Sequence, residues 1–267
     1  MCHSGNNYKM LNKVFLLAVS LLILYAFTTP VKHITIYLAG DSTMADKEVK
    51  AYPETGWGMP FHAFFDSTVT VNNIAKNGRS TKSFIAEGLW KSIADNVKDG
   101  DYVLVQFGHN DEVPTKATYT PEADFKANLV KFITETRDKK ANPILITPVA
   151  RRKFNTAGNI EETHEVYSAI VRKVAAEQNV PLIDLDKESQ AFIQKFGPEN
   201  SKMLFDYLEP GENPNYPQGK ADDTHFNELG ARKIAEIVLN DIKDQHLPLA
   251  DRIVKGQNTA TVNPQVK

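Results

Sequence analysis

Apolar segments typical of β-strands alternate with amphipathic segments typical of helices from residue 34 to residue 244, and this alternation constrains the fold more than any other feature of the chain. We predict strands over 34–39, 68–75, 101–107, 143–148 and 180–185. We predict helices over 61–65, 81–97, 161–178 and 227–244, and one more that Pro121 opens. Strands that alternate with helices of this length form a parallel sheet covered on both faces. The predicted fold is therefore α/β: a three-layer α/β/α sandwich around a central five-stranded parallel sheet.

The last two predicted helices each show an apolar stripe at helical spacing. The stripes consist of Val166, Ile170 and Val174, and of Ile234, Val238 and Ile242. Asn227 is expected to cap the final helix. Between 197 and 220 the alternation breaks in a stretch rich in glycine and proline, and loops of that length are usually functional or disordered. We predict one domain over 30–254 and a disordered tail over 255–267.

Residues 1–29 have the pattern of a leader rather than of the fold. Lys9 and Lys13 precede an apolar run over 14–27, which is typical of a secretory signal peptide. The run is shorter than the roughly 20 residues that span a bilayer, and no clear cleavage site follows it. An uncleaved N-terminal anchor stays open as the alternative. We therefore expect an exported protein that is associated with a membrane only if this leader is retained.

Composition excludes several classes of protein. Hydrophobic residues make up 42% of the chain, which is enough for a full core, and its formal net charge is −2. No basic patch is present, so a nucleic-acid partner is not expected. The single cysteine, Cys2, lies in the predicted leader and excludes both a disulfide framework and a cysteine-based metal site. The sequence indicates no oligomeric state.

Small polar turns follow the first three predicted strands. Ser42 follows the first, Gly78 the second and Asn110 the third. The carboxyl ends of parallel strands lie at one edge of a sheet, where open α/β proteins place their ligand crevice. The segment from Asp222 to His225 precedes the last helix, and we expect it at the same edge.

These residue types suit nucleophilic catalysis. A serine hydroxyl such as that of Ser42 needs a base within hydrogen-bond reach, which His225 supplies. The imidazole needs a carboxylate on its other nitrogen, and Asp222 lies three residues before it. The backbone amides of Ser42 and Gly78 and the side chain of Asn110 are candidate oxyanion donors, each worth roughly 3–4 kcal/mol in other hydrolases.

Four blocks in the chain match, in order, those of the SGNH (GDSL-type) hydrolases: Gly40-Asp41-Ser42, Gly78, Gly108-x-Asn110-Asp111 and Asp222-x-x-His225. The resemblance runs from about Ile34 to Leu247. It implies a flavodoxin-like α/β fold, Ser42 as nucleophile, Asp222 and His225 as its partners, and Ser42, Gly78 and Asn110 as the oxyanion hole. It implies no metal and no other cofactor.

Longer motifs resemble one branch, the rhamnogalacturonan acetylesterases. They are Gly-Asp-Ser-Thr-Met, Asn-Gly-Arg-Ser, Phe-Gly-His-Asn-Asp and Thr-Pro-Val-Ala-Arg-Arg. Thr43, where leucine is common in the superfamily, agrees with that branch. The resemblance implies a secreted serine esterase that removes O-acetyl groups from pectic polysaccharide through an acetyl-enzyme, with an acetylated polysaccharide or oligosaccharide as its substrate.

Several roles stay open from the residues alone. Asp223 competes with Asp222 for the acid position, although its offset from His225 suits it less and favours a role in capping the final helix. The candidates for substrate contact are His109, Arg151, Arg152, Tyr216 and Trp57. Structural alternatives are a histidine that buttresses its turn, arginines in salt bridges and a tryptophan in the core.

The alternatives for function are an acetylesterase for another glycan such as xylan, an esterase for lipids or thioesters, and two other classes. One is a metal-dependent phosphoesterase that uses Asp41, Asn110, Asp222 and His225 as ligands. Carboxylates and histidines are too sparse for the two-metal centre that such enzymes use. The other is a non-catalytic sugar-binding module, which a complete set of catalytic groups argues against.

Overall fold

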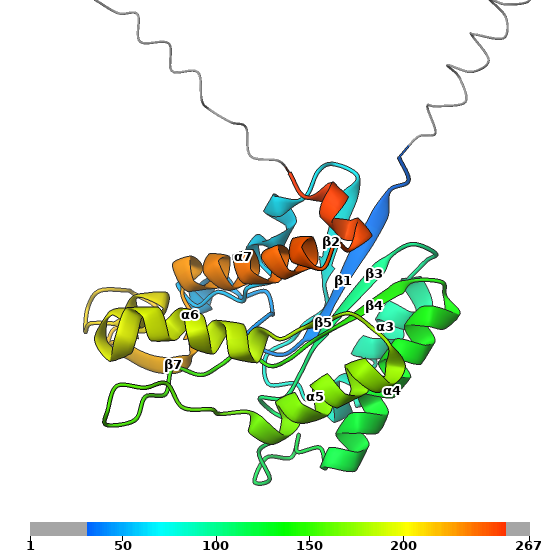
Figure 1. Cartoon of the computed structure of the whole chain (residues 1–267). Coiled ribbons are helices and arrows are strands. Elements are labelled where there is room, and N and C mark those ends of the chain that lie inside the picture. The colour runs from blue at the N-terminus through cyan, green and yellow to red at the C-terminus, as the bar shows by residue number, and fades with distance from the viewer. Residues whose placement is uncertain (1–30, 255–267) are drawn as a thin grey trace, which may run out of the picture. The chain divides into compact units, whose positions relative to one another are not determined.

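The computed structural model describes residues 31–254, and a five-stranded parallel sheet lies at its centre (Figure 1). The strands are β1 (Ile34–Gly40), β2 (Val69–Asn73), β3 (Tyr102–Gln106), β4 (Asn142–Ile146) and β5 (Leu182–Ile183). They are ordered β2-β1-β3-β4-β5, and every neighbouring pair is parallel. The predicted fold class is confirmed. The ends of β1, β2 and β3 therefore share one edge of the sheet.

Helices cover both faces of the sheet. One layer comprises α2 (Thr81–Ala86), α3 (Leu89–Asn96), α4 (Glu122–Asp138) and α5 (Glu165–Gln178), and the other comprises α6 (Leu185–Asn200) and α7 (Glu228–Asp244). Ile36 and Leu38 of β1 pack toward α6 and α7, whereas Tyr37 and Ala39 pack toward the other layer. Because both faces of β1 are buried, its sequence is an almost continuous apolar run.

The predicted helix over 81–97 is two helices. Gly88 has φ +75°, in the left-handed region that favours glycine, and it forms the N-cap of α3. Trp90 points inward after this break, and the centroid of its ring lies 4.2 Å from that of Phe132. The prediction missed the break because the apolar spacing continues across it.

Helix α5 begins at Glu165, four residues later than the predicted start at 161, and its buried stripe differs from the predicted one. Val166 is 49% exposed, whereas Tyr167, Val171 and Val174 are buried. The Tyr167 hydroxyl donates to the Thr120 carbonyl at 2.6 Å, which holds that face of the helix inward. The predicted stripe did not include Tyr167 because its side chain ends in a polar hydroxyl.

The chain after β4 differs most from the prediction. β5 is only two residues long, and Leu185 begins α6, a helix that the sequence analysis did not predict. Gly197 interrupts α6 near its end. The predicted loop over 197–220 instead contains η3 (Ser201–Leu204) and β6 (Phe205–Leu208), which pairs with β7 (Lys220–Phe226) in an antiparallel hairpin. The site segment 222–225 therefore lies in a strand directly before the last helix.

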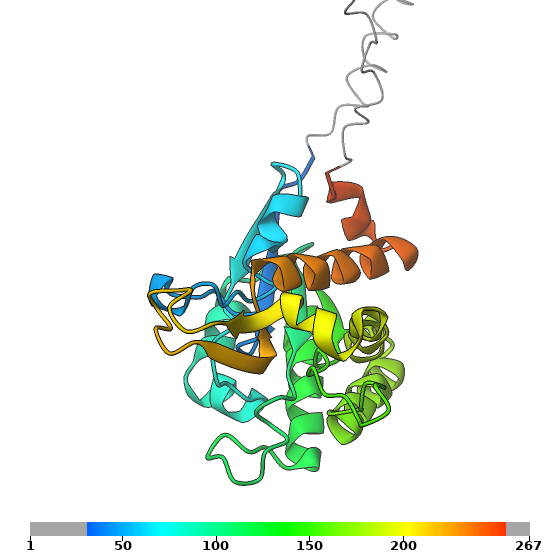
Figure 2. The ribbon, with the colours of Figure 1, turned by 90° about the vertical axis from the view of Figure 1, so that its left-hand side faces the viewer.

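Short 3₁₀ segments complete the described part of the chain: η1 (Val49–Ala51), η2 (Pro60–Phe64) and η4 (Pro248–Arg252). η2 stands where a helix was predicted over 61–65. Figure 2 shows the loop between β6 and β7 next to η1, and the Tyr216 hydroxyl donates to the Ala51 carbonyl there at 3.0 Å.

The final helix agrees with its prediction. The Asn227 side chain accepts a hydrogen bond from the Gly230 amide at 3.1 Å and caps α7, and the stripe Ile234, Val238 and Ile242 is buried. Within residues 31–254, no helix is both long and apolar enough to cross a membrane. The predicted leader over 1–29 and the predicted tail over 255–267 lie outside the described residues.

Candidate active site

Ser42 lies in a tight turn directly after β1. The Asp41 carbonyl accepts from the Ala45 amide at 3.0 Å, and the buried Asp41 carboxylate accepts from the Thr43 amide at 3.0 Å and from its hydroxyl at 2.9 Å. Aspartate favours such turns because its side chain bonds to the backbone two residues on. The turn leaves Ser42 half-buried at the edge of the sheet.

Side chains from β3 and from the loop after η1 support this turn. The side-chain nitrogen of Gln106, Nε2, donates to the Thr43 hydroxyl at 2.8 Å. The side-chain oxygen, Oε1, accepts from the Trp57 indole at 2.6 Å. Trp57 is fully buried and packs edge-on against Phe61 at 5.3 Å. Trp57 therefore belongs to the core, which was the structural alternative to its role as a candidate for substrate contact.

Ser42, His225 and Asp222 form one hydrogen-bonded chain. His225 Nε2 lies 2.8 Å from Ser42 Oγ, and His225 Nδ1 lies 2.8 Å from Asp222 Oδ2. The other Asp222 oxygen accepts from the backbone amides of Thr224 at 2.8 Å and His225 at 3.0 Å. This geometry lets the imidazole receive the serine proton at Nε2 while the carboxylate orients Nδ1.

The surroundings of Asp222 favour its charged form. Burial raises the pKa of this carboxyl group, but the hydrogen bond and charge of His225 and the two backbone amides outweigh burial and hold the pKa well below its usual value. Asp222 is therefore ionised at neutral pH, and it can stabilise a positive charge on the ring of His225.

Asp223 faces away from this chain because successive side chains of a strand point to opposite sides. Its carboxylate lies 2.6 Å from the Arg152 guanidinium and accepts from the Tyr207 hydroxyl at 2.5 Å. The expectation that Asp223 caps α7 is wrong, since Asn227 does so. Of the two neighbouring aspartates, only Asp222 bonds to His225.

The turn that contains Gly78 is tied to both Ser42 and Asn110. Gly78 has φ +76°, which glycine adopts without strain. On one side, Lys47 Nζ bridges the Ser42 carbonyl at 2.6 Å and the Asn77 side chain at 2.7 Å. On the other side, the side-chain amide of Asn110 donates to the backbone carbonyl of Arg79 at 3.0 Å. The structure thus brings the three segments with the predicted oxyanion donors to one edge of the sheet.

A sequence model of the GDSL-like lipase/acylhydrolase family matches residues 38–233. The chain belongs to this family. It is 42% identical to the rhamnogalacturonan acetylesterase RhgT of Bacillus subtilis over 85% of this chain and 97% of that protein. It is 37% identical to the probable rhamnogalacturonan acetylesterase YesY of Bacillus subtilis over 82% of this chain and 97% of that protein.

Among solved structures, the crystal structure of YxiM from Bacillus subtilis matches this GDSL-like hydrolase with a TM-score of 0.70 and 30% identity. The match covers 82% of this chain and 58% of that chain. Family membership together with the similarity to RhgT establishes a carboxylic ester hydrolase.

In this GDSL-like hydrolase, His109 lies in a buried polar cluster. Its ring packs against that of His164 at 4.3 Å, and burial, His164 and Arg151 hold the pKa of His109 well below its usual value. His164 Nδ1 lies 2.9 Å from both oxygens of Glu112, and Arg151 donates to the Thr224 hydroxyl at 2.8 Å. Through Arg151 and Thr224 the cluster therefore braces β7, the strand that carries His225.

The other candidates for substrate contact are also held by protein groups. Arg152 donates to Ser201 Oγ at 3.0 Å and to the Pro198 carbonyl, and it pairs with Asp223. The ring of Tyr216 lies 4.6 Å from the Lys220 ammonium. Arg151 is the most accessible cation of this group, with 28% of its side chain exposed. Contact of these residues and of His109 with substrate stays a prediction.

Three charged residues that the sequence analysis missed lie beside the serine and histidine. They are Glu54 and two lysines, Lys47 and Lys220. The ammonium of each lysine lies 2.8 Å from one oxygen of the Glu54 carboxylate. Single charged residues in polar segments are usually solvated, so no sequence signal distinguished them.

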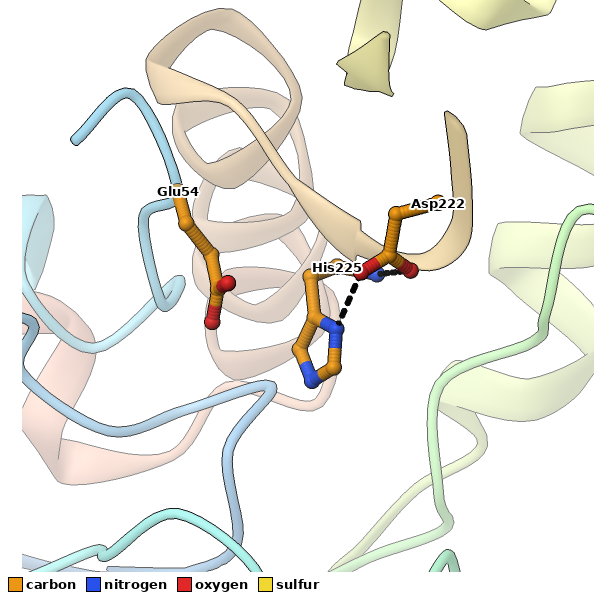
Figure 3. A group of neighbouring side chains, drawn as sticks. All are labelled: Glu54, Asp222 and His225. Atoms are coloured by element: carbon orange, nitrogen blue, oxygen red, sulfur yellow. Dashed lines mark hydrogen bonds and ion pairs between the residues drawn. The ribbon is translucent and has the colours of Figure 1, made fainter. Parts of the chain in front are cut away.

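Glu54, Asp222 and His225 also place oxygen and nitrogen atoms within 4.8 Å of one another (Figure 3). The Lys220 ammonium lies 2.8 Å from Glu54 and 3.7 Å from Asp222, and Lys47 pairs with the other Glu54 oxygen. Two lysines already compensate these carboxylates, so the group fits an ion-pair network better than a cation site.

The buried Asp111 predicts a pH-dependent stability. Burial raises the pKa of its carboxyl group to about 7, although hydrogen bonds from the Thr81 amide and hydroxyl partly oppose this. Between pH 4 and 7 the unfolded chain loses this proton while the folded chain keeps it, so the free energy of unfolding falls as pH rises. Relative to Asp111→Asn, the wild type should lose up to about 4 kcal/mol across that range.

Urea unfolding of both proteins between pH 4 and 8 measures this difference. The exposed Asp95→Asn serves as the control, and its stability should run parallel to that of the wild type across the range. A constant difference between the wild type and Asp111→Asn would show that Asp111 is ionised in the folded protein throughout.

Proposed function

We propose that this enzyme is a serine acetylesterase that removes O-acetyl groups from acetylated rhamnogalacturonan, a pectic polysaccharide. The observation that carries the proposal is the hydrogen-bonded chain from Asp222 through His225 to Ser42, at 2.8 Å for each contact of the ring. The choice of substrate is supported by RhgT and YesY, which the chain matches over nearly their whole length.

The first half of the reaction forms an acetyl-enzyme. Ser42 Oγ attacks the acetyl carbonyl carbon while His225 Nε2 takes its proton. The carbonyl oxygen becomes an oxyanion that accepts hydrogen bonds from the Ser42 and Gly78 amides and the Asn110 side chain. The carbonyl bond then re-forms, the bond to the sugar oxygen breaks, and His225 gives its proton to that oxygen.

The second half releases acetate. Water attacks the acetyl-enzyme as His225 takes one of its protons, and the same donors stabilise the second oxyanion. Collapse of this intermediate breaks the bond to Ser42 Oγ, which recovers its proton from His225. Apart from this water and the substrate, the steps use only groups of this chain, and acetate and the free sugar hydroxyl are the products.

We further propose that the enzyme is exported. A polysaccharide substrate is too large to enter a cell intact, and residues 1–29 have the pattern of a secretory leader. Export would place the described part of the chain where such polymers occur.

Acetate release from a panel of polymers tests the substrate. We expect release from acetylated rhamnogalacturonan to exceed that from acetylated xylan by at least about tenfold in kcat/KM. Deacetylated rhamnogalacturonan is the control, and activity should persist in excess chelator because no step uses a metal. Faster release from xylan would reassign the glycan. Hydrolysis of long-chain esters alone would refute a carbohydrate substrate.

A further inference from the structure

Lys47 joins three separate segments of the chain beside the candidate nucleophile. Its side chain is only 2% exposed, and its ammonium has three hydrogen-bond partners. These are the Ser42 carbonyl at 2.6 Å, the Asn77 side chain at 2.7 Å and Glu54 Oε1 at 2.8 Å. An ammonium has three donors, so Lys47 uses all of them to hold the nucleophile turn, the Gly78 turn and the loop after η1 together.

Glu54 continues this link to the strand that carries the other two members of the hydrogen-bonded chain. Its second oxygen, Oε2, lies 2.8 Å from Lys220 Nζ. Lys220 lies on β7 and also contacts Asp206 at 2.5 Å and Asp222 at 3.7 Å. The contacts therefore close a ring that runs from the Ser42 carbonyl through the two lysines and Glu54 to Asp222, and through His225 back to Ser42 Oγ.

Glu54 also faces the imidazole. Figure 3 shows the side chains of Glu54 and Asp222 next to the His225 ring, and the three residues place oxygen and nitrogen atoms within 4.8 Å of one another. Burial raises the pKa of Glu54, but Lys220, Lys47 and His225 outweigh it and lower the pKa, so the carboxylate is charged at neutral pH. Two carboxylates thus lie near the ring that becomes positive during acyl transfer.

Stability alone does not account for these charges. A buried ion pair loses much of its attraction to the cost of desolvation, and apolar side chains of similar size often serve stability equally well. An ion pair in which all the N–H donors have partners is directional, whereas an apolar contact is not. The arrangement around Glu54 fixes where the Ser42 turn lies relative to β7.

We propose that Glu54 is a positioning residue, which with Lys47 and Lys220 holds Ser42 at hydrogen-bond distance from His225. This inference rests on the serine mechanism proposed above. The three residues act through the ring of contacts and take no proton in the reaction. Because small displacements of reacting groups cost up to about 100-fold in rate, loss of the link should reduce kcat rather than binding.

Steady-state kinetics of Glu54→Gln with 4-nitrophenyl acetate tests the proposal. We expect kcat to fall by at least about tenfold and KM to change by less than about twofold, because the small ester does not depend on polysaccharide contacts. Circular dichroism verifies folding at the assay temperature. Glu177→Gln is the matched control, since Glu177 also pairs with two lysines, Lys126 and Lys173, but on α5. It should retain wild-type kcat.

Two further variants separate positioning from a purely structural role. Glu54→Asp keeps the charge between the lysines, which preserves folding, but is one methylene too short to reach both, so kcat should stay at least about threefold below wild type. In an Asp222→Asn background, Glu54→Gln should change kcat by less than about threefold, because both substitutions disturb the same imidazole.

The results distinguish this inference from the proposed function. A folded Glu54→Gln or Glu54→Asp enzyme with kcat within twofold of the wild type would overturn the positioning role and leave the serine mechanism intact. Multiplicative effects of Glu54→Gln and Asp222→Asn would also overturn it. Wild-type kcat in Ser42→Ala would instead refute the serine mechanism.

Discussion

Replacing Ser42 with alanine is expected to reduce kcat/KM for acetyl esters by about 10⁶-fold, the scale seen when other serine hydrolases lose their nucleophile. Alanine removes the Ser42 oxygen, which lies 2.8 Å from His225 Nε2. Within the described residues, no other group contacts Nε2 in its place. The fold should be retained, because Ser42 is half-buried and its side chain does not pack in the core. Acetate release and 4-nitrophenyl acetate hydrolysis measure the loss.

A fluorophosphonate that reacts with activated serines identifies the nucleophile directly. The wild type should gain one covalent adduct, on the peptide that contains Ser42, and Ser42→Ala should gain none. The control is Ser92→Ala on the exposed surface of α3, which should keep both labelling and activity. Hydrolysis by Ser42→Ala at more than about a hundredth of the wild-type rate would contradict the proposed mechanism.

The second large effect distinguishes two neighbouring aspartates. Asp222→Asn should lower kcat by about 10⁴-fold, because the amide favours the wrong imidazole tautomer and no longer compensates a positive ring. Asp223→Asn should lower kcat by less than about threefold, since Asp223 pairs with Arg152 and not with His225. Each substitution replaces one carboxylate oxygen with an amide nitrogen, and the two positions are adjacent. Each variant is therefore the control for the other.

Kinetics with 4-nitrophenyl acetate over pH 6 to 9 measures both variants. Thermal unfolding of each verifies that the fold survives at the assay temperature. Equal losses in the two variants would show that the hairpin as a whole, and not the contact between Asp222 and His225, limits the rate.

The sheet and the serine turn could be predicted because their signals are local. β1 is buried on both faces, so its apolar run is visible in the sequence, and Gly40-Asp41-Ser42 follows it directly. Asn110 and Gly78 were placed by the same reasoning, since strands of one parallel sheet end at one edge. The pairing of Ser42 with His225 followed from the chemistry that a serine nucleophile needs, and the family resemblance added the order of the blocks.

The hairpin of β6 and β7 could not be predicted in the same way. β7 reads Lys-Ala-Asp-Asp-Thr-His-Phe, and these polar residues lack the alternation of a half-buried strand. Its side chains are held instead by distant partners, such as Arg152 for Asp223 and Arg151 for Thr224. Those partners lie about seventy positions earlier in the chain, at a separation that no local pattern reports.

The sequence by itself determined the α/β class, the positions of the first four parallel strands and the identity of the serine, histidine and aspartate blocks, because burial and turn chemistry leave local patterns. Only the tertiary structure decided which aspartate meets the imidazole and which charges surround it. Lys47, Glu54 and Lys220 look like solvated residues until folding places the ammonium of each lysine 2.8 Å from a carboxylate oxygen of Glu54. The reason is physical: the strength of a charge–charge contact depends on distance and burial, and both are set by packing between remote segments.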